Sequence, residues 1–299
     1  MTPGGEAESA RRFLPPAATG ARRATLLTDD GVPIETRYEP SLAGGGLSAR
    51  APVIVVAHGF TGSLERPALR RVASAFTQHT AVITFSFRGH GRSGGRSTVG
   101  DREVLDLAAA VRWARSLGHR RVITVGFSMG GSVVLRHAAL TAQNRQNEQN
   151  EQNKPDPDQE REGRTGAHTA EADAVVAVSA PARWYYRGTA PMRRVHWAVT
   201  RPTGRLVSRY GLRTRIDARG WRTEPLPPVA AVPLIAPTPL LIVHGDRDPY
   251  FPLDHPRMLM AAADRASAQL WIEPGFGHAE TAAPAELLDR IAGWALASL

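Results

Sequence analysis

The sequence predicts an α/β fold with a mostly parallel central sheet, helices on both faces and a small inserted cap. Short β-branched runs alternate along the chain with stretches that have helical spacing of apolar residues. Several runs, such as 52–57 (PVIVVA) and 174–178 (AVVAV), are apolar throughout, which is typical of strands buried on both faces. The 299 residues, 42% of them hydrophobic, are ample for the core of one large domain.

The elements follow in a regular order after a polar tail at residues 1–23, which we expect to be flexible. An Asp-Gly turn at residues 28–31 lies between two short apolar runs and predicts a β-hairpin. The strands expected next are 52–57, 81–85, 121–125, 174–178, 239–243 and 269–272. The helices expected between and after them are 64–76, 101–116, 129–140, 255–263 and 284–296. This order predicts that residues 24–299 form a single domain.

Two segments interrupt that order. Residues 143–173 are rich in Gln and Asn and have only three alanines as apolar residues, so we expect a disordered insertion. Residues 180–237 are too long for a loop of a compact domain and hold three of the six tryptophans and three of the five tyrosines. We expect this second segment, the cap, to be a small helical excursion that covers the sheet.

Composition excludes several classes of protein. The absence of cysteine excludes disulfides, thiolate metal sites and cysteine nucleophiles. No apolar run approaches the length of a membrane span, and the N-terminal residues lack the hydrophobic core of a signal peptide. We therefore expect a soluble, cytoplasmic protein.

The formal charge of +9 is unevenly distributed. Residues 183–222 hold eleven arginines and one acid, whereas residues 143–173 hold four bases and eight acids. Because lysine is almost absent, we interpret the arginines mainly as solvated surface residues; a basic face that binds an anion is the alternative. No nucleic-acid partner is expected.

The strongest chemical signal is Gly126-Phe127-Ser128-Met129-Gly130, which fits Gly-x-Ser-x-Gly. It directly follows one expected strand and directly precedes a helix, as a nucleophile on a strained turn requires, and the two glycines remove side chains that would clash there. The helix N-terminus favours negative charge beside Ser128. An ordinary strand-to-helix turn is the alternative interpretation.

A serine nucleophile needs a base and an acid that orients the base. His278 lies in a glycine-rich loop after the last strand, and Asp248 follows the preceding strand. Both are therefore expected at the edge of the sheet where Ser128 emerges. Asp246 competes with Asp248 for the role of the acid.

The tetrahedral intermediate of acyl transfer needs two donors for its oxyanion. We expect the backbone N–H of Met129, next to the nucleophile, and that of Phe60, in the loop after the first central strand. The histidines that end strands, His58, His90 and His244, are interpreted as structural.

Residues 89–94 match the dinucleotide-binding motif Gly-x-Gly-x-x-Gly. A dinucleotide site is not expected, because that motif requires a helix to begin at the glycines and none is predicted there. The sequence also lacks His-Glu-x-x-His and any clustered ligand spacing. We expect neither a cofactor nor a metal.

Five motifs together carry a family resemblance: HGFTG at 58–62, FRGHGRSGG at 87–95, GFSMGG at 126–131, HGDRDPYFP at 244–252 and GFGHAE at 275–280. In order and spacing the chain resembles the α/β-hydrolase superfamily, most closely its serine esterase and acyl-hydrolase branch, with cinnamoyl-esterase-like and serine-aminopeptidase-like members. The resemblance covers roughly residues 50–140 and 238–299. It implies the α/β-hydrolase fold, the triad Ser128, Asp248 and His278, and the oxyanion donors Phe60 and Met129.

These observations predict a cofactor-independent serine hydrolase that acts on a small carboxylic ester through an acyl-enzyme. A peptidase or amidase, a thioesterase and an acyltransferase remain open on the same triad, and a non-catalytic ligand-binding protein of this fold is a further alternative. In the cap, Trp184 and Trp197 are candidate substrate-binding residues that favour an apolar or aryl acyl group of short to medium length.

Overall fold

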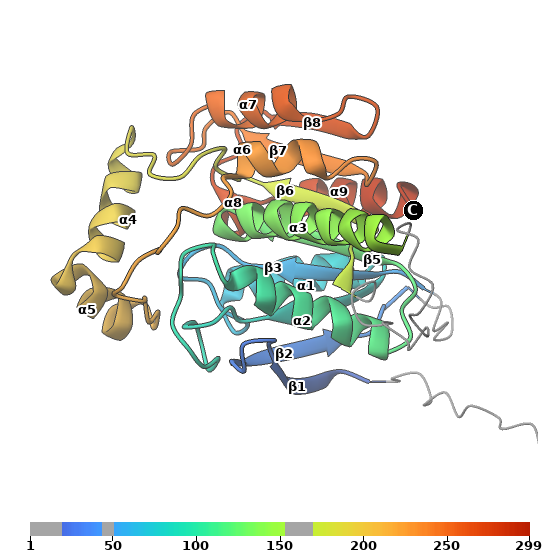
Figure 1. Ribbon diagram of the computed structural model, residues 1–299, viewed down its shortest axis with the longest axis horizontal. Coiled ribbons are helices and arrows are strands. Elements are labelled where there is room, and N and C mark those ends of the chain that lie inside the picture. The colour runs from blue at the N-terminus through green and yellow to red at the C-terminus, as the bar shows by residue number, and fades with distance from the viewer. Residues whose placement is uncertain (1–19, 44–50, 153–169) are drawn as a thin grey trace, which may run out of the picture.

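A computed structural model describes residues 20–43, 51–152 and 170–299 (Figure 1). Its centre is one sheet of eight strands in the order β1-β2-β4-β3-β5-β6-β7-β8. The strands are β1 (Arg22–Leu27), β2 (Pro33–Glu39), β3 (Val53–Ala57), β4 (Ala81–Phe85), β5 (Val122–Phe127), β6 (Ala174–Val178), β7 (Leu240–Gly245) and β8 (Ala268–Glu273). Only the pairs β1/β2 and β2/β4 are antiparallel. The predicted α/β fold is confirmed.

The hairpin β1/β2 closes where the Asp-Gly turn predicts it. Leu27 lies opposite Pro33, and Gly31 takes the positive φ of 76° that the turn needs. The Thr28 hydroxyl accepts the N–H of Val32 at 2.9 Å, which fixes the turn.

Helices cover both faces of the sheet. The helices outside the cap are α1 (Pro67–Thr77), α2 (Glu103–Ser116), α3 (Met129–Gln152), α7 (Asp254–Ala262), α8 (Ala279–Ala282) and α9 (Ala285–Ala297). Successive residues of β3 alternate between two cores: Val53 and Val55 pack with α2 and α3, whereas Ile54 and Val56 pack with α1 and α9. Burial on both faces explains why the central strands are continuous apolar runs.

Part of the segment 143–173, which was expected to be a disordered insertion, is helical in the structure. Helix α3 continues to Gln152, twelve residues beyond the expected end, and the Arg145 guanidinium forms two 2.7 Å hydrogen bonds with Glu171. Gln, Glu and Arg are good helix formers, so a helix begun by a buried segment extends into this polar sequence. The rest of the expected insertion, apart from residues 170–173, lies outside the described residues, as does most of the expected tail.

The cap is helical as expected, but it does not cover the sheet in the expected way. Helices α4 (Ala190–Thr200) and α5 (Pro202–Gly211) pack together and stand away from the sheet (Figure 1). In contrast, α6 (Pro228–Ala231) and the 3₁₀ turn η2 (Val232–Leu234) belong to the main core. No helix among the described residues is long and apolar enough to cross a membrane.

Candidate active site

Ser128 lies on a sharp turn between β5 and α3. Its φ is +52°, a strained value for a non-glycine residue, and its N–H donates to the carbonyl of Val178 on β6 at 2.9 Å. A Cβ at Gly126 would lie 2.2 Å from the Gly130 carbonyl oxygen, and one at Gly130 would lie 2.2 Å from the Ala57 carbonyl oxygen. Both glycines are therefore required, as expected of a nucleophile elbow.

The structure brings the three predicted triad residues together. The Nε2 atom of His278 lies 2.9 Å from the Oγ of Ser128, and its Nδ1 lies 2.7 Å from the Oδ2 of Asp248. These distances place base and nucleophile, and acid and base, within direct hydrogen-bond reach. The His278 side chain is 14% exposed and the Asp248 side chain is fully buried, so the site opens to solvent on the serine side.

Asp248 is held as a carboxylate. Its second oxygen accepts the backbone N–H groups of Tyr250 and Phe251 at 2.8 and 3.1 Å. Burial alone would raise the pKa of Asp248, but the hydrogen bond and charge of His278 outweigh burial and lower the pKa below its ordinary value. The competing residue, Asp246, instead accepts the N–H of Gly275 at 2.6 Å in an exposed turn. The geometry therefore favours Asp248 as the acid.

The loop after β3 offers one free donor beside the serine. The N–H of Gly59 is used by Glu280 at 2.9 Å, and the N–H of Thr61 points to His90 Nε2 at 3.4 Å. Between them, the N–H of Phe60 has no acceptor among the described residues. Met129, the first residue of α3, has an N–H that its own helix cannot use. Both N–H groups are therefore unpaired among the described residues, and their role as oxyanion donors stays a prediction.

Glu280 is a site residue that sequence reasoning missed. It lies on α8, two residues after His278, and is 7% exposed. A Cβ at Gly59 would lie 3.2 Å from both carboxylate oxygens of Glu280 and 3.4 Å from the Cβ of Ser128. The Glu280 carboxylate therefore packs directly against the loop after β3, which carries the expected oxyanion donor Phe60 and is called the oxyanion loop below. Burial raises the pKa of Glu280, although the hydrogen bond from the Gly59 N–H acts in the opposite direction and lowers it. Its only sequence signal was an acid in the GFGHAE motif.

A second missed residue is Tyr250. Its ring stacks on the His278 imidazole with centroids 4.2 Å apart and planes 28° apart. The Phe251 ring lies 5.7 Å from the same imidazole. These rings, from the loop that also carries Asp248, fix the plane in which His278 reaches Ser128.

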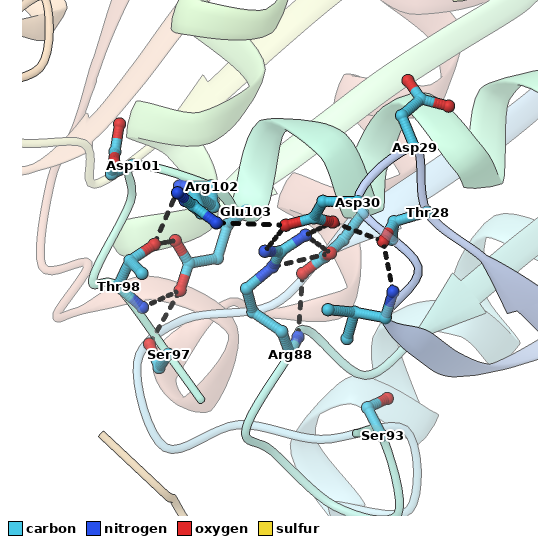
Figure 2. Close-up of polar contacts among 12 residues, drawn as sticks. Thr28, Asp29, Asp30, Arg88, Ser93, Ser97, Thr98, Asp101, Arg102 and Glu103 are labelled. Atoms are coloured by element: carbon cyan, nitrogen blue, oxygen red, sulfur yellow. Dashed lines mark hydrogen bonds and ion pairs between the residues drawn. The ribbon is translucent and has the colours of Figure 1, made fainter. Parts of the chain in front are cut away.

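Buried charged groups hold the loop after β4 (Figure 2). This loop contacts the loop after β3, because the N–H of Phe87 donates to Nε2 of His58. The Arg88 guanidinium lies between Asp30, at 2.7 Å, and Asp106, at 2.8 Å, and its side chain is only 3% exposed. The hydrogen bond from Arg88 lowers the pKa of Asp30 to about 2. Glu103, at the start of α2, accepts from Ser97 Oγ at 2.8 Å and from both N–H and Oγ of Thr98. The loop conformation is thus set by α2 and the β1/β2 turn.

The strand-end histidines have structural hydrogen bonds, as predicted. His58 Nδ1 donates to the Gly59 carbonyl at 2.7 Å while its Nε2 accepts the N–H of Phe87 at 3.0 Å. Burial lowers the pKa of His58 to about 3, so it is a neutral connector between two loops. His244 Nε2 donates to the Phe251 carbonyl at 2.8 Å and thereby supports the loop of Asp248.

The candidate substrate-binding tryptophans occupy different surroundings. The Trp184 indole donates to the Pro225 carbonyl at 2.9 Å, and its ring lies 5.3 Å from that of Trp221. Trp197 lies on α4 and is 44% exposed. No described contact joins either ring to Ser128 or His278, so their contact with substrate stays a prediction. Within residues 20–43, 51–152 and 170–299, no group of three or more His, Asp or Glu side chains is placed to hold a metal.

Comparison with known proteins shows which family the chain resembles. A model of the alpha/beta hydrolase family matches residues 54–290. A monoacylglycerol lipase of Mycolicibacterium smegmatis is 26% identical over 286 aligned residues, which cover 83% of this chain and 89% of the lipase. The chain spans about a third of the length of two other relatives. These are a candidate esterase/lipase of Haemophilus influenzae (30% identical, 30% of each chain) and a 31.7 kDa protein of Escherichia coli (34% identical, 29% of this chain and 32% of the relative).

Solved structures agree on the fold. An esterase of Pyrococcus furiosus matches with a TM-score of 0.63 at 21% identity and covers 92% of this chain and 89% of its own. A Butyrivibrio proteoclasticus protein with ferulic acid bound matches with a TM-score of 0.55 at 18% identity, over 92% and 100% of the two chains. At these identities the likeness shows the fold alone. Because the family model spans most of the sequence, the chain belongs to the α/β-hydrolase family.

Proposed function

We propose that this protein is a cofactor-independent serine hydrolase that cleaves small carboxylic esters through an acyl-enzyme. The observation that carries the proposal is the continuous chain of short contacts from Asp248 through His278 to Ser128, with Ser128 at a strained positive φ. A structural serine needs neither the strain nor an aligned imidazole.

In the proposed mechanism, the Oγ of Ser128 attacks the ester carbon while Nε2 of His278 takes its proton. Asp248 holds the Nδ1–H of the imidazole and stabilises the imidazolium that forms. The negative charge on the carbonyl oxygen is met by the N–H groups of Phe60 and Met129. His278 then returns the proton to the leaving alcohol, and a water activated by the same imidazole releases the acid and restores Ser128.

An ester substrate is the best-supported choice within this chemistry. Relatives and structural neighbours include a monoacylglycerol lipase and an esterase, and one neighbour was solved with ferulic acid, an aryl acid. We therefore place esters before amides and thioesters, with an apolar or aryl acyl group.

A fluorophosphonate probe tests the nucleophile directly. We expect it to label the wild-type protein once, at Ser128, and not to label Ser128→Ala, whose thermal unfolding should match the wild type. A panel of p-nitrophenyl esters from acetate to palmitate, run beside aminoacyl nitroanilides and a thioester, then ranks the acyl and leaving groups. Labelling or turnover that persists in Ser128→Ala would refute the assignment, and faster cleavage of nitroanilides than of esters would make the protein an amidase.

A further inference from the structure

The cap hairpin, defined as α4 and α5 (residues 190–211), exposes an unusual amount of apolar surface. Among the described residues, nine large hydrophobic side chains are exposed, and six lie in or beside this hairpin: Tyr185, Trp197, Leu206, Val207, Tyr210 and Leu212. Tyr210 is 71% exposed and Leu206 is 59% exposed. No residue of α4 is buried. A soluble surface rarely gathers such side chains in one short segment without a function.

The geometry of α5 turns this apolar surface away from the rest of the molecule. Gly204 and Ser208 are the buried residues of α5. A Cβ at Gly204 would lie 2.3 Å from the Trp197 carbonyl oxygen, so this face of α5 packs on α4. Leu206 and Tyr210 are four residues apart and two residues from Gly204 and Ser208, which places them on the opposite face. The outer face of α5 therefore carries an apolar stripe.

Arginines accompany the apolar residues on both helices. On α4, Arg194 and Trp197 are three residues apart and both exposed, so they share one side of the helix, and the exposed Arg201 follows directly after its last residue. On α5, the Arg209 guanidinium lies 5.4 Å from the centre of the Tyr210 ring. The combination is basic and apolar side chains side by side, rather than a basic face opposite an apolar one.

The positive charge of this region is largely unneutralised. Residues 183–222 contain eleven arginines and one acid, Asp217, which pairs with Arg219 at 2.8 Å. Arg183 pairs with Asp254 outside the segment. In the part of the chain that the structure describes, none of the hairpin arginines forms an ion pair. The hairpin therefore presents uncompensated cations beside Trp, Tyr and aliphatic side chains.

We propose that the cap hairpin docks this protein on the surface of an anionic lipid bilayer. A bilayer interface supplies both partners that the hairpin lacks, because acyl chains accept Leu206 and Val207 while lipid headgroups accept the arginines and the amphipathic rings. A nucleic acid would pair with the arginines but would leave the aliphatic side chains exposed. A second copy of the same face would bring arginines against arginines.

The position of the hairpin gives docking a consequence for the site. The chain leaves the sheet after β6, whose Val178 carbonyl binds the Ser128 N–H, and returns where Thr214 and Ile216 pair with His90 and Ser97. The hairpin therefore projects from the edge of the sheet that carries Ser128. A protein docked through it would face lipid-dissolved substrates. The docking itself does not rest on the proposed chemistry, because binding can be measured without turnover.

Vesicle co-sedimentation of the full chain tests the proposal, with Ser128→Ala used so that no lipid is hydrolysed. Two vesicle types are compared: phosphatidylcholine alone, and phosphatidylcholine with phosphatidylglycerol at about a 7:3 ratio. We expect binding only to the anionic vesicles, weakened at high salt. Arg194→Gln/Arg209→Gln should weaken this binding by about tenfold or more, and Leu206→Ser/Tyr210→Ser by a similar factor.

Matched controls lie far from the hairpin. Leu27 is 69% exposed on β1, and Arg120 and Arg265 are exposed in loops. Leu27→Ser and Arg120→Gln/Arg265→Gln should bind vesicles like the parent protein. Absence of binding to anionic vesicles, or equal losses in hairpin and control variants, would overturn the proposal. Unchanged vesicle binding by Leu206→Ser/Tyr210→Ser would show that the hairpin surface is purely ionic, which also overturns the proposal. A concentration-dependent dimer that Leu206→Ser/Tyr210→Ser abolishes would make a second copy of the chain the occupant of this surface and would overturn the proposal as well.

Discussion

Two regions at the same edge of the sheet differ in how they are held. The loops after β3 and β4 are fixed by buried polar groups: neutral His58, the Arg88 ion pairs and the Glu103 hydrogen bonds. The cap hairpin has no buried residue in α4, and among the described residues its arginines form no ion pair. Arginine therefore has opposite roles in the two regions. In the loops it determines backbone geometry, whereas in the hairpin it determines surface potential.

The difference predicts where substitutions are costly. A change in the loops should disturb the placement of Ser128, Phe60 and His278, because their supporting groups cannot find water as a substitute partner. A change in the hairpin should leave the fold intact and alter only what meets the surface.

The largest effect is expected for Asp248→Asn. The amide would hold His278 in the wrong tautomer, so kcat should fall by about 10³ to 10⁴ with little change in the thermal midpoint. Asp246→Asn is the matched control and should retain nearly full activity, because Asp246 binds only the exposed turn at Gly275. Steady-state kinetics on one activated ester decide between them. A larger loss in Asp246→Asn would reassign the acid.

The next effect is on stability. Arg88→Met would leave the fully buried Asp106 carboxylate without its cation, so the free energy of unfolding should fall by about 3–5 kcal/mol. Arg194→Met, on the exposed side of α4, should change it by less than about 0.5 kcal/mol. Urea unfolding measures both. Arg88→Met/Asp106→Leu should recover part of the loss, and a nearly wild-type Arg88→Met would show that the network is dispensable.

Glu280 is expected to act as a positioning residue for the oxyanion loop. Glu280→Ala would free the Gly59 N–H and loosen the loop that carries Phe60, so kcat should fall by about tenfold with KM little changed. Glu280→Gln keeps an acceptor for the same N–H and should restore most of the rate. A loss in KM rather than in kcat, or no rescue by glutamine, would mean that Glu280 serves the fold or the substrate instead.

Sequence reasoning worked best where a residue's own chemistry or a continuous apolar run decides its place. Strands 81–85 and 174–178 were predicted with the bounds of β4 and β6, because burial on both faces leaves no charged residue inside them. The contacts among Ser128, Asp248 and His278 followed from their places at strand ends.

The errors arose where tertiary context overrides composition. Glu280 reaches Gly59 across 221 residues of sequence, and only the folding of α8 onto that loop shows the contact. The Gln/Asn-rich segment was judged by its low hydrophobicity, although α3 was already nucleated by its buried first turns. The cap was expected to cover the sheet, yet its helices α4 and α5 stand away from the sheet, and Trp197 and Tyr210 on them are exposed (Figure 1).

The smallest effects are expected for the two cap tryptophans, and they test whether the cap contacts substrate at all. Trp184 packs on Trp221, whose indole donates to the Thr98 carbonyl at 2.6 Å, so Trp184 joins the base of the cap to the loop that Glu103 holds. Trp184→Ala should therefore lower both stability, by about 1–2 kcal/mol, and kcat/KM.

Trp197→Ala should leave stability unchanged, because the ring is 44% exposed on a helix without buried residues. With water-soluble esters and no vesicles present, we expect a few-fold loss of kcat/KM that grows from acetate to butyrate and benzoyl, since only contacts improved in the transition state raise the rate. Equal rates of wild type and Trp197→Ala across that series would remove Trp197 from substrate recognition and leave it to the outward face of the hairpin.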